Sequence, residues 1–329
     1  MIQRPRLEPL DFDRVRDLRL NRLVQIHDMP QALADRAFTE LLYRGHPYGH
    51  LAIGSEESLR ALTLDEVKGF HERAYVPAGA TVIAAGDATH GELIALVTAA
   101  FNRWSGARAA NDDAAMLAAP AEPPVHLAIL HRPGAAQSEL RLGHVSVSRS
   151  DPDYVRLLVL NMVLGGQFVS RINMNLREKR GYTYGARTSF DARRGPGPFV
   201  LQASVQSDAT ADAIREAVRE IDDIRAARPV TEEELDTGRA ALTRGYARNF
   251  ETADQVARAA TQMALHDLPD DYYSTFVPRV LAIDEAEVTA AAERHLHPDR
   301  MLTIVVGDRE RIGASLEALG LGEPLDLSP

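Results

Sequence analysis

An internal repeat constrains the fold of this chain more than any other feature of its sequence. Residues 61–87 align without a gap on residues 282–308, at an offset of 221 residues. Nine of the 27 aligned pairs are identical, against about two expected from average residue frequencies. These pairs are Ala61/Ala282, Glu66/Glu287, Val67/Val288, Glu72/Glu293, Arg73/Arg294, Pro77/Pro298, Ile83/Ile304, Gly86/Gly307 and Asp87/Asp308. The chain is therefore predicted to hold two copies of one α+β lobe in tandem.

The first copy of the repeat reads as a helix followed by a strand. Thr63 and Glu66 form a capping box, the pairing of a hydroxyl with a Glu three residues later that begins a helix, here running to about Ala74. The second copy has Asp284 and Glu287 at the same positions. The apolar run 80–85 is then predicted to be a buried strand ending at Gly86-Asp87.

The second copy is predicted to belong to a complete lobe over residues 123–320. We expect a two-layer lobe, with an antiparallel sheet covered by helices on one face. The predicted strands are 126–131, 139–147, 186–193 and 199–206, and the predicted helices include 153–164, a short helix to about residue 177, 210–227 and 232–248. Residues 321–329 are left as a tail.

The first copy is predicted to belong to an incomplete lobe over residues 1–105, followed by a linker over 106–122 that is rich in Ala, Pro, Gly and Asp. Because the second lobe begins near residue 126, the offset of 221 places the start of the first lobe well ahead of Met1. A naturally short first lobe is the alternative. Either way, we expect exposed sheet edge and apolar surface, and hence self-association or dependence on a partner.

Composition excludes several classes of function. The chain has no cysteine, which rules out disulfides, cysteine-ligated zinc, iron–sulfur clusters and thiol catalysis. A net charge of −10 argues against a nucleic-acid binder. No run reaches the roughly 18–20 apolar residues of a membrane span, and the first six residues lack the apolar core of a signal peptide. Of 37 basic residues only Lys68 and Lys179 are lysines, which indicates a GC-rich, bacterial genome; the compartment stays open, because any signal peptide would lie upstream.

The densest group of candidate functional residues lies between positions 164 and 185. Gly165-Gly166 ends one helix and lets another begin, and Gly181 ends the second. Arg177 falls in the last helical turn, with Tyr184 seven residues later on a short extended run that also holds Tyr182. A guanidinium beside a phenol suits a peptide carbonyl or carboxylate. Spacing alone favours the other interpretation, in which a buried Tyr and a helix-capping Arg have only structural roles.

These residues resemble a known family. Leu164-Gly165-Gly166, Ser170-Arg171 and Leu176-Arg177-Glu178, with Arg180-Gly181 and Tyr184-Gly185-Ala186, are similar to the second lobe of the pitrilysin/insulinase family of zinc peptidases, which includes the mitochondrial processing peptidases. His46-Pro47-Tyr48-Gly49 with Gly54, and Tyr75-x-Pro77 leading to Gly86-Asp87, resemble its first lobe. The resemblance implies that Arg177 and Tyr184 contact the substrate backbone near the scissile bond, and we assign Gly165, Gly166 and Tyr182 to substrate binding.

The sequence departs from this family at the metal. It has no His-x-x-Glu-His, the inverted zinc motif of the family. The family's third zinc ligand is a Glu, and its place falls at about Arg22, which cannot ligate zinc. His46 and His50, and His295 and His297, are interpreted as structural, since Pro47 and Gly49 interrupt any helix between the first two and the second two have no third ligand nearby. We therefore assign no metal ligand and no cofactor to this chain.

The resemblance to this family and the absence of its zinc motif together favour a zinc-free subunit. It would bind a peptide, which adds as an edge strand, and lend Arg177 and Tyr184 to a zinc-bearing homologous partner that performs hydrolysis. One alternative is a structural assembly subunit, like the peptidase-like core proteins of respiratory complexes. Another is a fragment of an active zinc peptidase, against which Arg22 counts. The partner, the substrate peptide and the compartment cannot be read from this sequence.

Overall fold

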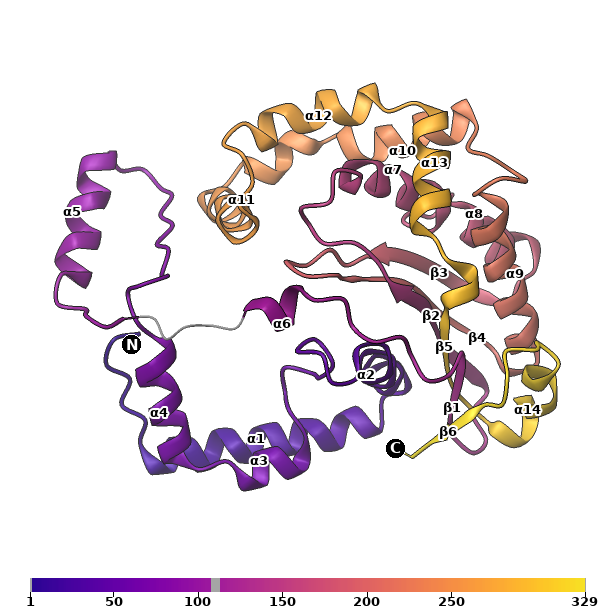
Figure 1. Cartoon of the computed structure of the whole chain (residues 1–329), viewed down its shortest axis with the longest axis horizontal. Coiled ribbons are helices and arrows are strands. Elements are labelled where there is room, and N and C mark those ends of the chain that lie inside the picture. The colour runs from indigo at the N-terminus through magenta and orange to yellow at the C-terminus, as the bar shows by residue number, and fades with distance from the viewer. Residues whose placement is uncertain (1, 108–112, 329) are drawn as a thin grey trace. The chain divides into compact units, whose positions relative to one another are not determined.

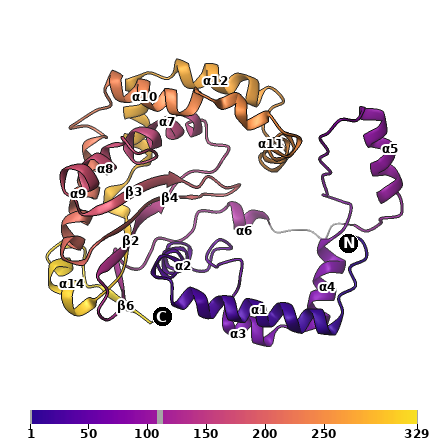
Figure 2. The same cartoon turned by 180° about the vertical axis from the view of Figure 1, so that it is seen from behind.

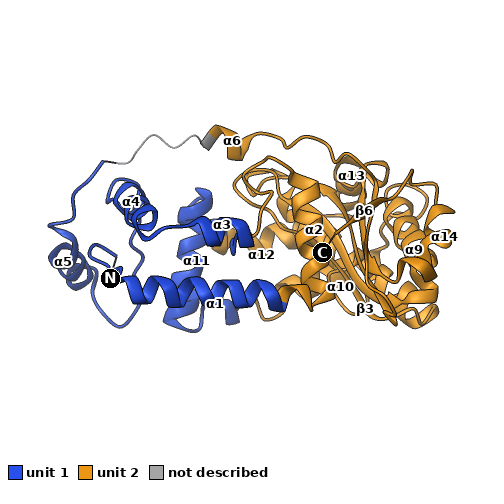
Figure 3. Cartoon of the chain, turned by 90° about the horizontal axis from the view of Figure 1, so that it is seen from below, with its two compact units in different colours: residues 1–25, 52–113, 247–272 blue, residues 26–51, 114–246, 273–329 orange. Residues whose placement is uncertain are grey.

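The computed structural model describes residues 2–107 and 113–328, which form two compact units. Unit 1 comprises residues 1–25, 52–113 and 247–272, and unit 2 comprises residues 26–51, 114–246 and 273–329 (Figure 3). The predicted segments 1–105 and 123–320 therefore each contribute to both units. The linker predicted at 106–122 contains a short helix, α6 (Asp113–Leu117), while its residues 108–112 lie outside the described part of the chain.

Unit 2 is built on a six-stranded sheet with the order β3-β4-β2-β5-β1-β6. Its strands are β1 (Leu127–His131), β2 (Gln137–Val145), β3 (Thr183–Phe190), β4 (Pro198–Gln206), β5 (Leu302–Gly307) and β6 (Leu325–Leu327). The predicted α+β class and the four predicted strands of this lobe are confirmed. The sheet is mixed rather than antiparallel, because β1 pairs in parallel with both β5 and β6. Long helical connections between these strands permit that direction, and β6 lies in the segment predicted to be a tail.

Helices cover both faces of this sheet. On one side lie α7 (Tyr154–Leu164), α8 (Arg171–Asn173), α9 (Thr210–Asp223) and α13 (Glu285–His295), and α10 (Glu232–Thr243) and α13 pack against α7. Figures 1 and 2 show α2 (Pro30–Tyr43) on the other side. All six residues of β5 are buried, as a strand covered on both faces requires. The expectation of helices on one face only is therefore wrong.

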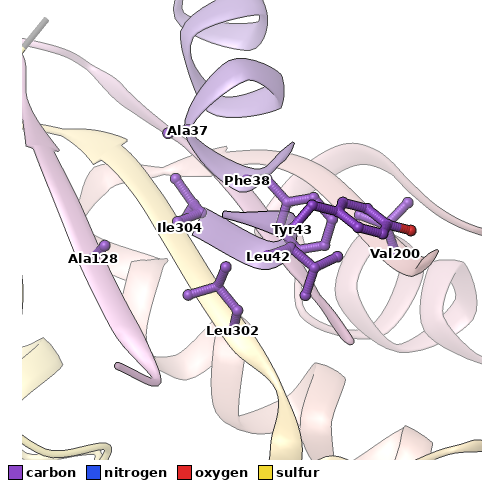
Figure 4. Close-up of a cluster of buried hydrophobic side chains, with 8 residues drawn as sticks. All are labelled: Ala37, Phe38, Leu42, Tyr43, Ala128, Val200, Leu302 and Ile304. Atoms are coloured by element: carbon purple, nitrogen blue, oxygen red, sulfur yellow. The ribbon is translucent and has the colours of Figure 1, made fainter. Parts of the chain in front are cut away.

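The contact between α2 and the sheet is apolar at its centre and polar at its edge. Phe38, Leu42 and Tyr43 pack over Leu302 and Ile304 of β5 (Figure 4). Beside them, the guanidinium of Arg141 on β2 donates to Asp35 Oδ1 at 2.6 Å and to the carbonyl of Gln31 at 3.1 Å. Arg141 is 3% exposed, so these partners on α2 compensate the cost of burying its charge.

Further short elements complete unit 2. They are α12 (Tyr272–Ala282), most of which lies in this unit, α14 (Arg309–Glu317), the π-helix η1 (Met174–Lys179) and the 3-10 helices η2 (Ser207–Ala209) and η4 (Pro298–Arg300). A third 3-10 helix, η3 (Tyr246–Phe250), has its first residue in unit 2 and its other residues in unit 1.

The described residues of unit 1 contain helices and connecting segments, but no strand. It contains most of α1 (Pro9–His27), with α3 (Glu56–Ala61), α4 (Leu64–Ala74), α5 (His90–Phe101) and α11 (Ala253–His266). Its buried hydrophobic residues within the described ranges are Leu23, Leu59, Val76 and Tyr272. Within residues 2–107 and 113–328 of the whole chain, no helix is both long and apolar enough to cross a membrane.

The helical half of the internal repeat is reproduced in both units. α4 and α13 have the same bounds once the offset of 221 residues is applied, and both begin with a complete capping box, Thr63 with Glu66 and Asp284 with Glu287. The strand half is reproduced only at β5. The strand predicted at 80–85 is absent, and Val82 is 50% exposed. A strand persists only where a neighbour satisfies its backbone groups, and the described residues of unit 1 offer no such neighbour.

A buried histidine, His144, is hydrogen-bonded to the backbone near one end of β2. His144 on β2 is 3% exposed; its Nδ1–H donates to the carbonyl of Val145 at 2.8 Å, and its Nε2 accepts from the backbone N–H of His297 at 3.1 Å. Burial lowers the pKa of His144 from 6.5 to about 4. The imidazole is therefore neutral at pH 7.

We expect Phe38→Ala to lower the free energy of unfolding of unit 2 by about 3–5 kcal/mol, the usual cost of removing a buried phenyl ring. Phe70→Ala is the matched control, because Phe70 is 59% exposed on α4, and it should change stability by no more than about 0.5 kcal/mol. Urea unfolding followed by far-ultraviolet circular dichroism is the measurement, since the single tryptophan, Trp104, lies in unit 1. Equal effects of the two substitutions would contradict the packing of α2 described above.

We also expect unit 2 to lose stability between pH 7 and pH 5. His144 takes up a proton near pH 6.5 when unfolded but only near pH 4 when folded, so the unfolded state binds more protons in this window. The free energy of unfolding should fall by about 2 kcal/mol between these pH values. In His144→Gln, whose amide oxygen can still accept from His297, most of this fall should disappear, while His50→Gln, at an exposed loop histidine, should behave as the parent chain does.

Candidate functional site

The segment that carries Arg177 is a π-helix. α8 continues directly into η1 (Met174–Lys179), whose wider turns are visible in the bond from the N–H of Arg180 to the carbonyl of Asn175, at 3.0 Å. Leu176 is fully buried and anchors the turn to the core, while the side chain of Arg177, one residue later, is 31% exposed. π-turns inside helices occur frequently at functional sites. The predicted short helix is thus present, but its last turn is wider than an α-helix.

The helix and the following strand are joined by a tight connection. Gly181 has φ +67°, a left-handed conformation that favours glycine, and its N–H donates to the carbonyl of Arg177 at 3.0 Å. The N–H of Tyr182 donates to the carbonyl of Leu176 at 2.9 Å. These bonds place the end of η1 beside the start of β3, as the Gly181 break predicted.

A β-bulge displays Tyr184. Thr183 pairs with Val205 and Ala186 with Ala203, so three steps along β3 match two along β4 and one residue is extra. Tyr184 lies within this bulge, and it is 91% exposed. Thr183 fixes the bulge, because its hydroxyl contacts the carbonyls of Gly185 and Ser204 at 2.9 and 2.6 Å and accepts from the N–H of Gly185 at 3.1 Å. The alternative interpretation, in which Tyr184 is buried with its hydroxyl group hydrogen-bonded, is therefore wrong.

The outer edge of β3 beyond the bulge is already hydrogen-bonded. The N–H of Ala186 donates to Asn173 Oδ1 at 2.9 Å, and the N–H of Thr188 donates to the carbonyl of Gly165 at 3.1 Å. A peptide adding as an edge strand needs these groups free. At residues 186–188 such an addition would have to displace Asn173 and Gly165.

Gly165 and Gly166 have a packing role that the sequence did not indicate. A Cβ atom on Gly165 would lie 2.5 Å from Thr188 Oγ1, and one on Gly166 would lie 2.6 Å from Asn161 Nδ2. Both positions require glycine because the loop approaches β3 and α7 so closely. Gly165 also caps the C-terminus of α7, as predicted.

The side chains of Arg177 and Tyr184 have no hydrogen bond to each other in the described residues. The guanidinium carbon of Arg177 lies 4.0 Å from the centre of the Phe168 ring, and Arg177 Nε is 3.6 Å from Glu178 Oε1. Within the described residues no hydrogen bond joins Arg177 to Tyr184. The arrangement offers a cation and a phenolic donor on adjoining segments, with Phe168, itself 60% exposed, as a third surface group that sequence reasoning missed.

The helix that leads into this site is held by an ion pair that sequence reasoning also missed, between the buried Arg171 and Glu234, whose side chain is 30% exposed. Arg171 is 8% exposed and makes two bonds of 2.6 Å to the carboxylate of Glu234, besides bonds to the carbonyls of Arg228 and Pro229. These bonds and the capping box with Thr231 lower the pKa of Glu234, outweighing the opposing effect of burial. Glu234 lies in the acidic first turn of α10. This bond joins α8 to α10, which are far apart in the sequence, so no local sequence pattern predicts it.

The described residues do not fit a zinc ion of the peptidase type. Among them, three donors lie close enough together in one group only, Asp151, Asp153 and His295. Asp153 Oδ2 already contacts His295 and Arg294, both at 2.8 Å, and its Oδ1 accepts from Arg156 at 3.2 Å. Two guanidinium groups on one carboxylate disfavour a cation there. This group is a structural link between α7 and α13.

The other residues considered for metal binding are also engaged elsewhere. Arg22 lies on α1, and its guanidinium donates to Gln25 Oε1 at 3.0 Å. His46 Nδ1 accepts from the N–H of Tyr48, and its Nε2 contacts the carbonyl of Ala118 at 3.2 Å. His295 is the last residue of α13, and His297 lies before η4.

Comparison with solved structures supports the fold. A crystal structure of a peptidase M16 inactive domain from Pseudomonas fluorescens matches with a TM-score of 0.85 and 25% identity, over 93% of this chain and 72% of that one. A protease from Helicobacter pylori matches with a TM-score of 0.79 at 18% identity, over 91% of this chain and 72% of the other, which shows the fold alone.

Sequence comparison identifies the same group. An uncharacterized zinc protease of Mycobacterium tuberculosis is 27% identical over 302 residues, which are 90% of this chain and 67% of that protein. One from Streptomyces coelicolor is 27% identical over 231 residues, 68% of this chain and 49% of that protein. The model of the peptidase M16 inactive domain matches residues 61–242. The pitrilysin/insulinase resemblance is thereby confirmed, and the chain belongs to the peptidase M16 inactive-domain family.

Proposed function

We propose that this chain is a zinc-free peptidase subunit that binds peptide through Arg177 and Tyr184 and acts beside a zinc-bearing homologous partner. The observation that carries the proposal is the exposure of Tyr184. A bulge held by Thr183 keeps a large aromatic side chain 91% exposed, which packing does not require. The family assignment and the poor fit of the described residues to zinc support a role in substrate binding rather than in metal chemistry.

The chemistry of the two side chains suits a peptide backbone. A phenol keeps its proton at neutral pH and can donate to a carbonyl oxygen, above all when that oxygen becomes negative in the transition state. The guanidinium of Arg177 is always charged and presents several donors in one plane, so it can hold one or two carbonyls. Its stacking on Phe168 limits its rotation, which lowers the entropy lost on binding.

The capped edge of β3 restricts how the peptide binds. Because the N–H groups of Ala186 and Thr188 already have partners, we place the peptide at the bulge and η1, held by side chains. The expected addition of the peptide as an edge strand is therefore not placed at residues 186–188. Gly165 and Gly166 then act through packing, by keeping β3 in place, while Tyr182 adjoins the bound segment.

We expect the purified chain to bind no stoichiometric zinc. Among the described residues, one cluster brings three donor groups close together, and it contains Asp153. The carboxylate of Asp153 is already bonded to two guanidinium groups and an imidazole. Elemental analysis after purification without chelators is the measurement. About one tightly held zinc per chain would contradict the proposal that the partner supplies the metal.

We expect Tyr184→Phe and Arg177→Ala each to reduce peptide cleavage by the chain with its zinc-bearing partner at least tenfold, since one lost oxyanion donor costs on the order of 10²–10³ in turnover. The melting temperature should stay within a few degrees, because both side chains are at the surface. Arg187→Ala is the matched control, since Arg187 is exposed on β3 and bonds only Gln202 among the described contacts. Unchanged cleavage with both Tyr184→Phe and Arg177→Ala would rule out the assignment.

A further inference from the structure

A pocket adjoins the segment that carries Arg177. It has a volume of about 320 Å³, and all of its lining residues belong to unit 2, from α8, η1, α9, α10 and the loops beside them. Two stretches of chain lead from Arg177 to this pocket. Phe168, whose ring lies against the guanidinium of Arg177, is followed by Val169, which lines the pocket. Within η1, Met174 and Lys179 line the pocket on either side of Arg177 in the sequence.

The two carboxylates that line the pocket already have partners. Glu220 is 5% exposed; its Oε1 accepts from Asn175 Nδ2 at 2.8 Å, and its Oε2 pairs with the guanidinium of Arg228. Both carboxylate oxygens of Glu234 accept from Arg171, each at 2.6 Å. A cationic ligand would have to compete with these guanidinium groups for the same oxygens, and a buried charge that loses its partner is costly. The pocket is therefore poorly suited to a cation.

Positive charge is left over in the same pocket. Three cationic and two anionic side chains line it. Lys179 is exposed and has no ion pair or hydrogen bond among the described residues, whereas the next residue, Arg180, lies 2.7 Å from Glu216 Oε1. Arg228 is 51% exposed and uses only its Nη2 among the described contacts, for Glu220. The pocket thus offers an ammonium group and spare guanidinium donors, which suit a carboxylate.

The wall of the pocket nearest to Phe168 is apolar. Val169 and Met174 line it and are 57% and 45% exposed. Four of the seven exposed large hydrophobic residues in the described part of unit 2 lie between positions 168 and 184: these two, Phe168 and Tyr184. A ligand with an apolar stem and a terminal carboxylate matches both parts of the pocket, and the side chains of glutamate and aspartate have this form.

We propose that this pocket binds an acidic side chain of the peptide, so that the chain selects peptides with a glutamate or aspartate close to the segment held by Arg177 and Tyr184. The proposal rests on the proposed function, because η1 carries both Arg177 and the residues of the pocket. Lys179 and Arg228 hold the carboxylate, while Val169 and Met174 pack on its methylene groups. Peptides with the acid should bind about tenfold more tightly than the same peptides with the amide, which is the contribution of one hydrogen bond between charged groups.

The lysine content of the chain provides a direct test of the pocket. The chain has two lysines, Lys179 in the pocket and Lys68 on α4 in unit 1, so reductive methylation with ¹³C-formaldehyde gives two lysine signals in a nuclear magnetic resonance spectrum. Lys179→Arg assigns them. N-acetylglutamate α-amide should shift the Lys179 signal in a saturable way and leave that of Lys68 unchanged, while N-acetylglutamine α-amide should shift neither. No shift of Lys179, equal shifts of both lysines, or equal shifts with both compounds would overturn the proposal.

Peptide binding separates this proposal from the proposed function. In a series of fluorescent nonapeptides with one Glu or one Gln moved along the sequence, we expect one position at which Glu binds about tenfold more tightly. Lys179→Gln should reduce that preference to twofold or less, while Lys68→Gln keeps it and Arg177→Ala weakens both kinds of peptide alike. Binding without a preference at any position would overturn the acidic pocket and leave the proposed function standing. Peptide binding unchanged by Arg177→Ala and Tyr184→Phe would instead contradict the proposed function, while the response of Lys179 to the glutamate derivative would still support the pocket.

Discussion

The need of each strand for a hydrogen-bonding neighbour governs this structure. β5 meets it, because β1 and β2 bond it on both sides and helices cover both of its faces. The remaining elements of unit 2 follow from that position: α13 leads into β5 and packs on α7, and α2 seals the opposite face with Phe38 and Tyr43. Residues 81–86 have the sequence for the same role, but the described residues give them no neighbouring strand, and no strand forms there.

The candidate site is a consequence of how β3 lies at the end of this sheet. With one neighbour only, β3 has an outer edge, and Asn173 and Gly165 bond its N–H groups there. The bulge at Tyr184 interrupts the pairing of β3 with β4, its single neighbouring strand. The place of β3 at the end of the sheet therefore accounts for its bonded outer edge. The bonds of Arg171 to Glu234 join α8, which leads into η1, to α10.

Local sequence signals predicted local structure well here. The capping boxes at Thr63 and Asp284, the break at Gly181 and the four strands of the second lobe are each set by residues within a few positions of one another. What sequence alone missed depends on partners far along the chain. The pairing of β1 with β6, the position of α2 on the second face and the bond between Arg171 and Glu234 each join segments that no periodicity relates. The strand predicted at 80–85 failed for the complementary reason, since its apolar pattern was read correctly but a strand also requires a neighbour.

The contrast between the two copies also bears on how each can change over evolutionary time. At β5 each side chain meets a strand or helix of the same chain, so a substitution is tested by folding itself, and Val305 and Val306 fill their places fully. At the equivalent positions Ala84 is exposed and Ala85 is half-buried, and neither lies in a strand. The two copies therefore differ in what their sequences record: at positions 305 and 306 the requirements of a packed sheet, and at positions 84 and 85 no packing requirement of the described residues.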